Sequence, residues 1–246
     1  KSFPASVYYN RLAQRLLNAL TAMGRDGRLY EVDTRLRPSG EEGLLAVSLE
    51  ALTKYFDSSA WTFEFMAFTK ARMIAGDAAL CHSLNAFIGQ QLNRPRDTEK
   101  LRVDVFDMRE RIAREHGTSN PWNLKYVRGG LVDVDFIAEY LLLRHAPQTP
   151  GAQPGGASQI YGWLKERGLM PAAEAEQLIE ADRFLGQIFH MLRLCQDHYF
   201  DESSALPGLR KLLAESAGEL DFQALRERLI QVEQAVYEQY NRLLHA

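Results

Sequence analysis

The sequence predicts a mainly α-helical protein, in which the remnant of an α/β lobe with one clear strand is fused to a C-terminal helical bundle. Apolar residues recur at helical spacing through most of the 246 residues. One segment alternates apolar and charged residues, as a half-buried strand does. Glycines and aspartates stand where helices would end and begin. We expect the lobe to span residues 1–76 and the bundle residues 77–246.

The lobe is predicted to begin with a helix that precedes the strand. Apolar residues at helical spacing predict the helix over 6–22, and glycines follow it. The strand is expected over 29–37, because side chains alternate with period two until Pro38. A single strand leaves its backbone groups without partners, so we expect the pairing strands to lie before Lys1. Since the first residue is also not methionine, we interpret the chain as a fragment of a longer protein.

The rest of the chain is predicted to be helical. Gly117 and Gly168 follow helical segments at positions suited to a left-handed C-cap, and Asp77 and Asp97 suit N-caps. Residues 147–156 are rich in proline, glycine and glutamine, which predicts a surface connection. The helices are expected at 49–56, 60–75, 78–91, 98–116, 131–145, 159–167, 172–198, 206–214 and 222–244.

Composition and charge exclude several classes of protein. The net charge is −3, so no global basic field attracts nucleic acid, and we expect no nucleic-acid partner. No apolar run approaches the ~20 residues that cross a bilayer, so we expect no membrane association. Cys81 and Cys195 lack the spacing of metal-binding pairs and suit reduced thiols. The sequence thus predicts a cytoplasmic protein.

Four charged side chains share one face of the predicted strand. Period two places Glu31, Asp33, Arg35 and Arg37 there, with neighbours about 6.5 to 7 Å apart. A carboxylate is a hard ligand for Mg²⁺ and guanidinium groups bind phosphate oxygens in pairs, so this order suits an Mg-nucleotide site. The alternative is a solvated face whose exposed ion pairs contribute about 0 to 1 kcal/mol each. The pattern alone favours neither interpretation.

A turn is predicted directly after these charges. Pro38-Ser39-Gly40 and then Gly43 predict a flexible turn beside the two arginines, where backbone amides can approach a phosphate. An ordinary surface turn explains the same residues equally well.

Several segments together resemble bacterial glutamine synthetase adenylyltransferase. They follow in the order of that family, and residues 31–40, Glu-Val-Asp-Thr-Arg-Leu-Arg-Pro-Ser-Gly, resemble its C-terminal, adenylylating half. The last hundred residues match in helical character more than in wording. The matching segments are Tyr30 to Gly40, Gly43-Leu-Leu, Ser48-Leu-Glu-Ala, Ala60-Trp61 through Lys70-Ala-Arg72, Ala75-Gly-Asp77, Asn123-Leu-Lys125 and Gly129-Gly-Leu-Val-Asp-Val-Asp-Phe136.

The resemblance implies a nucleotidyltransferase that regulates glutamine synthetase in nitrogen metabolism. One half of such enzymes transfers AMP from Mg-ATP to a tyrosine of glutamine synthetase, and the other removes it with phosphate. The resemblance implies Mg²⁺ as cofactor, ATP and glutamine synthetase as substrates, and a PII-type signal protein as partner of the full-length enzyme. By the same resemblance, Asp33 is the catalytic third metal ligand. The implied nucleotide-binding residues are Arg35, Arg37, Ser39, Gly40, Lys70, Arg72 and Lys125.

The chain departs from the family pattern at several positions. No Asp-x-Asp precedes Asp33, although the family takes two of its three metal-binding carboxylates from such a pair. A displacement with two metal ions needs both ions clamped, so we expect this chain alone to be nearly inactive. Asn123 replaces an aspartate of the family and Asp135 a glutamate. Phe65 and Met66 stand where the family has histidine and glutamine.

Helical geometry limits the role of Lys70 and Arg72. They lie about 200° apart around a helix, so at most one of them faces a nucleotide. The helix 60–75 is apolar almost all round, which predicts a buried packing helix. The charged stretch 101–115 is interpreted as a solvated helix with intrahelical ion pairs.

Gly129, Gly130, Asp133 and Asp135 are weaker site candidates at the start of the helix 131–145. The glycines permit a tight turn, and acids in a first helical turn are stabilised by the helix dipole by about 0.3 to 1 kcal/mol each. Asp133 and Asp135 point to different sides of the helix. This capping role is favoured over metal binding.

Two other functions remain open. The chain fits the deadenylylating half of the same enzymes, for which the acceptor is phosphate. It also fits a non-catalytic helical module that docks glutamine synthetase or a PII-type protein. Phosphate-dependent release of AMP distinguishes the first alternative, and partner binding without ATP affinity the second.

Overall fold

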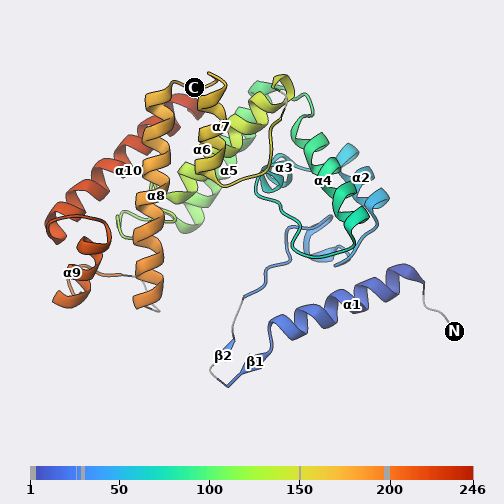
Figure 1. Cartoon of the computed structure of the whole chain (residues 1–246), viewed down its shortest axis with the longest axis horizontal. Helices are drawn as coiled ribbons and strands as arrows, with labels where there is room; N and C mark the ends of the chain where they lie inside the picture. Colours follow the sequence, from blue (N-terminus) through green and yellow to red (C-terminus); the bar gives the residue numbers. More distant parts are fainter. Residues whose placement is uncertain (1–3, 26, 29–30, 150, 197–199, 246) are drawn as a thin grey trace.

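A computed structural model describes residues 4–25, 27–28, 31–149, 151–196 and 200–245, and these residues are mainly helical, as predicted (Figure 1). No helix in this part of the chain is long and apolar enough to cross a membrane. The elements are α1 (Ala5–Leu20), β1 (Met23–Gly24), β2 (Gly27–Arg28), η1 (Gly40–Glu42), α2 (Leu49–Ser58), α3 (Thr62–Phe68), α4 (Ala78–Leu92), α5 (Thr98–His116), α6 (Leu131–His145), η2 (Ala146–Gln148), α7 (Ala157–Glu166), α8 (Ala172–Cys195), α9 (Pro207–Ser216) and α10 (Phe222–Leu244).

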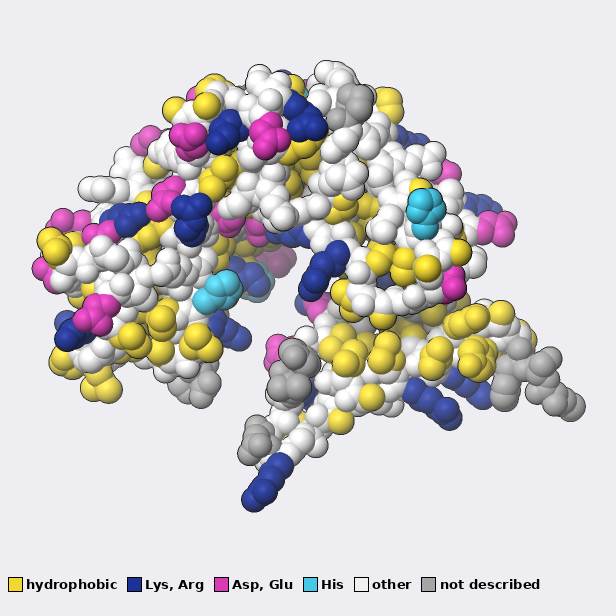
Figure 2. Space-filling view, in the orientation of Figure 1, with side chains coloured by type: hydrophobic (Ala, Val, Ile, Leu, Met, Phe, Trp, Pro, Cys, Tyr) yellow, Lys and Arg dark blue, Asp and Glu magenta, His cyan; other side chains and the backbone are white. Residues whose placement is uncertain are grey.

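Helix α1 extends along one side of the molecule with its apolar side chains uncovered. None of its residues is buried, and Val7, Leu12 and Leu16 are exposed. Figure 2 shows hydrophobic side chains gathered along α1. The side chain of Asn10 ties the helix to Ala46 through two hydrogen bonds of 2.9 and 3.1 Å to its backbone. The helix is therefore anchored by polar contacts rather than by packing.

The prediction of a strand over 29–37 is wrong for residues 31–37, which form a loop. Residues 29 and 30 lie outside the described part of the chain. The sheet that the structure describes is the short antiparallel hairpin of β1 and β2. The backbone N–H of Arg35 donates to Asp33 Oδ1, and that of Arg37 to the carbonyl of Arg35, both at 2.9 Å. These local turns use amides that a sheet would need, so alternation of side chains did not produce a strand here.

Helices α2, α3 and α4 pack around a group of phenylalanine rings. Phe56 stacks on Phe68 with ring centres 4.4 Å apart. Phe65 and Phe87 meet Phe56 edge to face at 5.3 and 5.9 Å. Burial of each such side chain contributes about 1.5 to 3 kcal/mol. Phe65 and Phe68 of α3 thus pack against the core, as predicted, whereas Phe63 and Trp61, which directly precedes the helix, are exposed.

Helix α3 is shorter than the helix predicted over 60–75. It ends at Phe68, where the hydroxyl of Thr69 donates to the carbonyl of Met66 at 2.7 Å. The carbonyl of Thr69 accepts the N–H of Gly155 at 2.6 Å, so the connection 147–156 crosses the end of α3. Ala152 is buried within that connection, whereas its other described residues are exposed or half-buried, in agreement with the predicted surface segment.

Helix α6 is the centre of the bundle. Its residues from Phe136 to Leu143 are all buried, and α5, α7, α8 and α10 pack around it (Figure 1). Gly168 adopts a φ of +65°, which suits the turn between α7 and α8. Helix α3 contacts both α5 and α6. The N-terminal helices are therefore joined to the bundle through α3.

Candidate functional site

Asp33 and Arg35 lie together in the loop that replaces the predicted strand. Arg35 Nη2 is 2.6 Å from Asp33 Oδ2, and Arg35 Nε donates to both carboxylate oxygens at 3.0 Å. Both side chains are exposed, by 59% for Asp33 and 71% for Arg35. The hydrogen bonds from Arg35 lower the pKa of Asp33 to about 2. The carboxylate of Asp33 is therefore ionised and accessible. A metal cation that binds it has to displace Arg35.

Arg37 points back into its own loop instead of sharing a face with Asp33. Its Nη1 donates to the carbonyl of Thr34 at 2.5 Å, its Nε to that of Gly43 at 3.1 Å and its Nη2 to that of Glu41 at 2.9 Å. The side chain thus holds the loop closed. As the loop stands, three guanidinium nitrogens of Arg37 are occupied by the backbone.

The turn at Ser39 and Gly40 has a left-handed backbone. Their φ angles are +63° and +56°, and Ser39 is the non-glycine residue with positive φ in the described part. Such a conformation costs a non-glycine residue of order 1 kcal/mol or more, and it persists where surrounding contacts fix it. At Gly43 a Cβ atom would lie 1.8 Å from the carbonyl oxygen of Pro38, so the close approach requires glycine. The predicted turn is therefore present, and its backbone conformation requires glycine at position 43.

Lys70 binds two carboxylates of α6. Its Nζ lies 2.7 Å from Asp135 Oδ2 and 3.1 Å from Glu139 Oε1. Burial raises the pKa of Glu139 to about 7, although Lys70 acts to lower it. Burial also raises the pKa of Asp135. The cluster holds one cation and two carboxylates, and it connects the segment after α3 to the bundle.

Lys125 is exposed and lines an open cleft. The cleft has a volume of about 610 Å³ and lies between the turn 122–126 and the second half of α8. Phe189 and Arg193 of α8 line it, and no described carboxylate does. Lys125 Nζ also lies 5.0 Å from the ring centre of Tyr126. Lys125 is thus an exposed cation in a cleft that also contains Arg193 and is lined by no described carboxylate.

Asp133 is buried and faces away from Asp135, as its spacing predicts. It forms an ion pair with Arg109 in which neither side chain is exposed, and it accepts the N–H of Gly129. The prediction that residues 101–115 are solvated is wrong for Arg109, because the helix turns this residue toward α6. Asp133 therefore stabilises the start of α6 within the core.

Gly129 and Gly130 are required by close packing. Gly129 has a φ of +80°, and a Cβ atom there would lie 1.7 Å from the carbonyl oxygen of Glu233 in α10. A Cβ atom at Gly130 would lie 2.4 Å from the carbonyl oxygen of Leu124. The double glycine thus allows α10 and the turn 122–126 to approach the start of α6.

The candidates form separate groups in the described residues. Asp33 and Arg35 make one group, Lys70 and Asp135 another, and Arg72 is exposed without a recorded ion pair. Sequence reasoning missed Glu139, although its i,i+4 spacing from Asp135 was a usable signal. No group of three or more His, Cys, Asp or Glu side chains in the described residues could hold a metal ion. The described carboxylates therefore do not complete a metal site around Asp33.

Two family models match different parts of the chain. A model for glutamate-ammonia ligase adenylyltransferase matches residues 1–86. A model for GlnD PII-uridylyltransferase matches residues 100–244, which include most of α5 and all of α6 to α10. The first match ends within α4, and the second begins within the first turn of α5.

Relatives cover nearly the whole chain. It is 37% identical over 244 residues to a protein from Bradyrhizobium sp. strain BTAi1, covering 99% of this chain and 25% of the relative. A protein from Xanthobacter autotrophicus is 37% identical over 237 residues, or 96% of this chain and 24% of the relative. One from Brucella suis is 38% identical over 245 residues, or 99% and 25%. All three are named bifunctional glutamine synthetase adenylyltransferase/adenylyl-removing enzyme, and the chain spans about a quarter of their length.

Proposed function

Since this chain belongs to the family of bifunctional glutamine synthetase adenylyltransferase/adenylyl-removing enzymes, we propose that it is part of the half that transfers AMP from Mg-ATP to a tyrosine of glutamine synthetase. The observation that carries this proposal is the exposed, ionised Asp33 beside Arg35, in the segment that matches the adenylyltransferase model. In the whole enzyme the activity regulates nitrogen assimilation in the cytoplasm. A PII-type signal protein is the proposed regulatory partner of that enzyme.

Asp33 is the proposed metal-binding and catalytic carboxylate. Its charge and exposure fit an Mg²⁺ ligand, because Mg²⁺ prefers carboxylate oxygens and is held by few protein groups. No group of three or more His, Cys, Asp or Glu side chains in the described residues could hold a metal ion, and no Asp-x-Asp precedes Asp33 in the sequence. The chain thus lacks some of the carboxylate ligands that a reaction with two bound metal ions needs. We propose that the chain is nearly inactive alone.

Arg35 is the proposed phosphate ligand of the same loop. Its guanidinium is exposed and pairs only with Asp33 among the recorded ion pairs. When Asp33 binds a cation, Arg35 loses that partner and becomes available for phosphate oxygens, which it can bind in pairs. Arg37, Ser39 and Gly40 would then act by holding the loop in shape. Arg37 does so through its bonds to three carbonyl groups.

The remaining cations differ in how accessible they are. Lys125 and Arg72 are exposed and are proposed to contact the nucleotide or its phosphates. Lys70 is held by Asp135 and Glu139, so its contact with a nucleotide would require these ion pairs to open. We therefore assign Lys70 mainly to positioning the N-terminal lobe, residues 1–76, against the helical bundle, residues 77–246.

Transfer of labelled AMP from Mg-ATP to unmodified glutamine synthetase tests the proposal. The chain is compared with a protein of the full length of its relatives, so that the complete donor set is present. We expect label on glutamine synthetase with the long protein and almost none with the chain alone. Absence of transfer by both proteins contradicts the proposal, provided that both are folded.

The deadenylylating half is a second candidate, because the relatives' names include the adenylyl-removing activity. This function predicts phosphate-dependent release of AMP from adenylylated glutamine synthetase. If Asp33→Asn abolishes this release in the long protein but leaves AMP transfer unchanged, the chain belongs to the deadenylylating half. Binding of glutamine synthetase by the chain in the absence of any ATP affinity would instead favour a docking module.

A further inference from the structure

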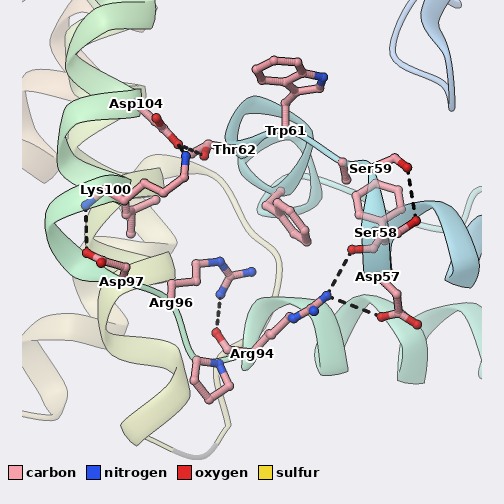
Figure 3. A pocket seen from close by; sticks show the side chains of 15 residues that line it. Asp57, Ser58, Ser59, Trp61, Thr62, Arg94, Arg96, Asp97, Lys100 and Asp104 are labelled. Carbon is pink, nitrogen blue, oxygen red and sulfur yellow. Dashed lines mark hydrogen bonds and ion pairs between the residues drawn. The ribbon is translucent and has the colours of Figure 1, made fainter.

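A second pocket lies between the end of α2, the start of α3 and the connection from α4 to α5 (Figure 3). Its volume is about 330 Å³. It contains none of the residues that the proposed transfer reaction uses. Arg94 and Arg96 enter it from the α4–α5 connection, and Trp61 stands beside it with 71% of its side chain exposed.

Arg96 is a half-buried cation without a carboxylate partner in the described residues. Its guanidinium lies over the ring of Phe65, 5.0 Å from the ring centre. Nη1 donates to the carbonyls of Leu92 at 3.0 Å and Arg94 at 2.7 Å, and Nη2 donates to that of Gln91. Burial, with a smaller effect of Arg94, lowers the pKa of Arg96 to about 10. The side chain is still charged at neutral pH, and no described acid compensates it.

The carboxylates that line the pocket have partners of their own. Asp57 pairs with Arg94 across 3.4 Å. Asp104 pairs with Lys100 at 2.8 Å and accepts the hydroxyl of Thr62. Asp97 caps α5 by accepting the N–H groups of residues 99 and 100 at 2.9 Å. The acids therefore balance Arg94, Lys100 and the helix end, and they leave the charge of Arg96 unbalanced.

Hydrogen-bond donors also remain free for a ligand. Arg96 has five N–H bonds and the three recorded acceptors leave the Nε–H and one Nη2–H without a partner. Arg94 donates from Nη1 to the carbonyl of Phe56 at 3.1 Å and to Asp57, while its Nε and Nη2 have no recorded acceptor. Two adjacent guanidinium groups with open donors match the several oxygens of a tetrahedral anion.

We propose that this pocket binds a phosphate group between Arg94 and Arg96, as inorganic phosphate or as the phosphate of a nucleotide. The bound anion supplies the counter-charge that Arg96 lacks. Trp61 also lines the pocket and is largely exposed, so its fluorescence is the reporter for binding there. The site is separate from the loop that carries Asp33, so it does not depend on the proposed AMP transfer.

Titration of inorganic phosphate and of AMP, followed by tryptophan fluorescence, tests this site in the chain itself. Trp61→Phe identifies the signal of Trp61 against those of Trp122 and Trp163. We expect saturable changes for at least one ligand at millimolar concentration or below. If AMP binds at least tenfold more tightly than phosphate, the site takes a nucleotide. Similar affinities indicate that it takes the free anion.

Substitution of the two arginines then decides whether binding occurs in the pocket. Arg94→Gln and Arg96→Gln are each expected to weaken binding about tenfold or more, since each removes charge-assisted hydrogen bonds. Arg167→Gln is the matched control, because Arg167 also lies 5.0 Å over an aromatic ring, that of Trp163, outside the pocket. If Arg96→Gln unfolds, the less buried Arg94 decides the test. No saturable binding, or binding that a folded Arg94→Gln variant retains in full, overturns the proposal.

Discussion

Arg109 of α5 and Asp133 of α6 form an ion pair in which neither side chain is exposed to solvent. Asp133 also accepts the N–H of Gly129, and Arg109 Nη2 lies 3.3 Å from the carbonyl oxygen of Tyr126. The pair therefore fixes both the start of α6 and the turn that carries Lys125. Removing two charges from water costs several kcal/mol per ion, which good pairing offsets.

Arg109→Ala is expected to lower the free energy of unfolding by about 3 to 5 kcal/mol, because it leaves Asp133 as a buried charge without a partner. Urea denaturation followed by circular dichroism measures this loss. Arg111→Ala is the control, since Arg111 is exposed on the same helix, and its effect should stay within about 0.5 kcal/mol. Equal effects of the two substitutions would contradict a stabilising role of the buried pair.

Lys70→Met tests the tie between the N-terminal helices and the bundle. The substitution removes the cation that Asp135 and Glu139 share, so the pKa of Glu139 should rise further above about 7. We expect a loss of about 1 to 2 kcal/mol of unfolding free energy at pH 8 and a smaller loss at pH 5, where Glu139 takes up a proton. Lys54→Met, an exposed lysine of α2, serves as control. A loss that is independent of pH would exclude this charge cluster as its cause.

Glu233 of α10 predicts a dependence of stability on pH. Burial raises its pKa from an ordinary value of 4.5 to about 8, and its Oε1 has no hydrogen-bond partner in the described residues. Between these two pH values the folded protein holds a proton that the unfolded chain has released. The free energy of unfolding contributed by Glu233 therefore falls as the pH rises through this window.

Glu233→Gln removes this titration while keeping the size of the side chain. At pH 9 the variant should be more stable than the original protein by on the order of 3 to 5 kcal/mol, and the difference should shrink toward pH 5. Thermal or urea unfolding across the pH range measures it. Glu238→Gln, which changes an exposed carboxyl of the same helix, is the matched control. If the stability of Glu233→Gln differed from that of the original protein by the same amount at every pH, the pKa of Glu233 would not be raised by folding.

The helical part of the fold was predictable because its signals are local. The helices predicted at 98–116, 131–145 and 222–244 have the observed bounds. Asp97 accepts the N–H groups of the first turn of α5, as a cap should. The end of α3 was not predictable, because a contact from Gly155, far along the chain, meets the backbone at Thr69.

The site was less predictable than the fold, because its contacts depend on the tertiary structure. The alternating pattern placed Arg37 on one face with Asp33, but a strand needs a neighbouring strand, and the loop folded on itself instead. Arg109 has acidic neighbours on its own helix, so local pairing was as reasonable as the buried pair with Asp133. Burial decided between them, and burial is set by how α5 meets α6.

Asp33→Asn is expected to abolish most AMP transfer in a protein of the full length of the relatives, by about 100-fold or more, because a neutral amide is a poor ligand for a hard cation. Folding should be unchanged, since Asp33 is exposed and its recorded ion pair is with exposed Arg35. Asp201→Asn is a matched control, because Asp201 is also an exposed carboxylate with lowered pKa, held by local hydrogen bonds from Ser203. Transfer rates and unfolding midpoints are measured for both variants. If Asp33→Asn transfers AMP at the rate of the Asp201→Asn control, Asp33 is not a metal ligand of the reaction.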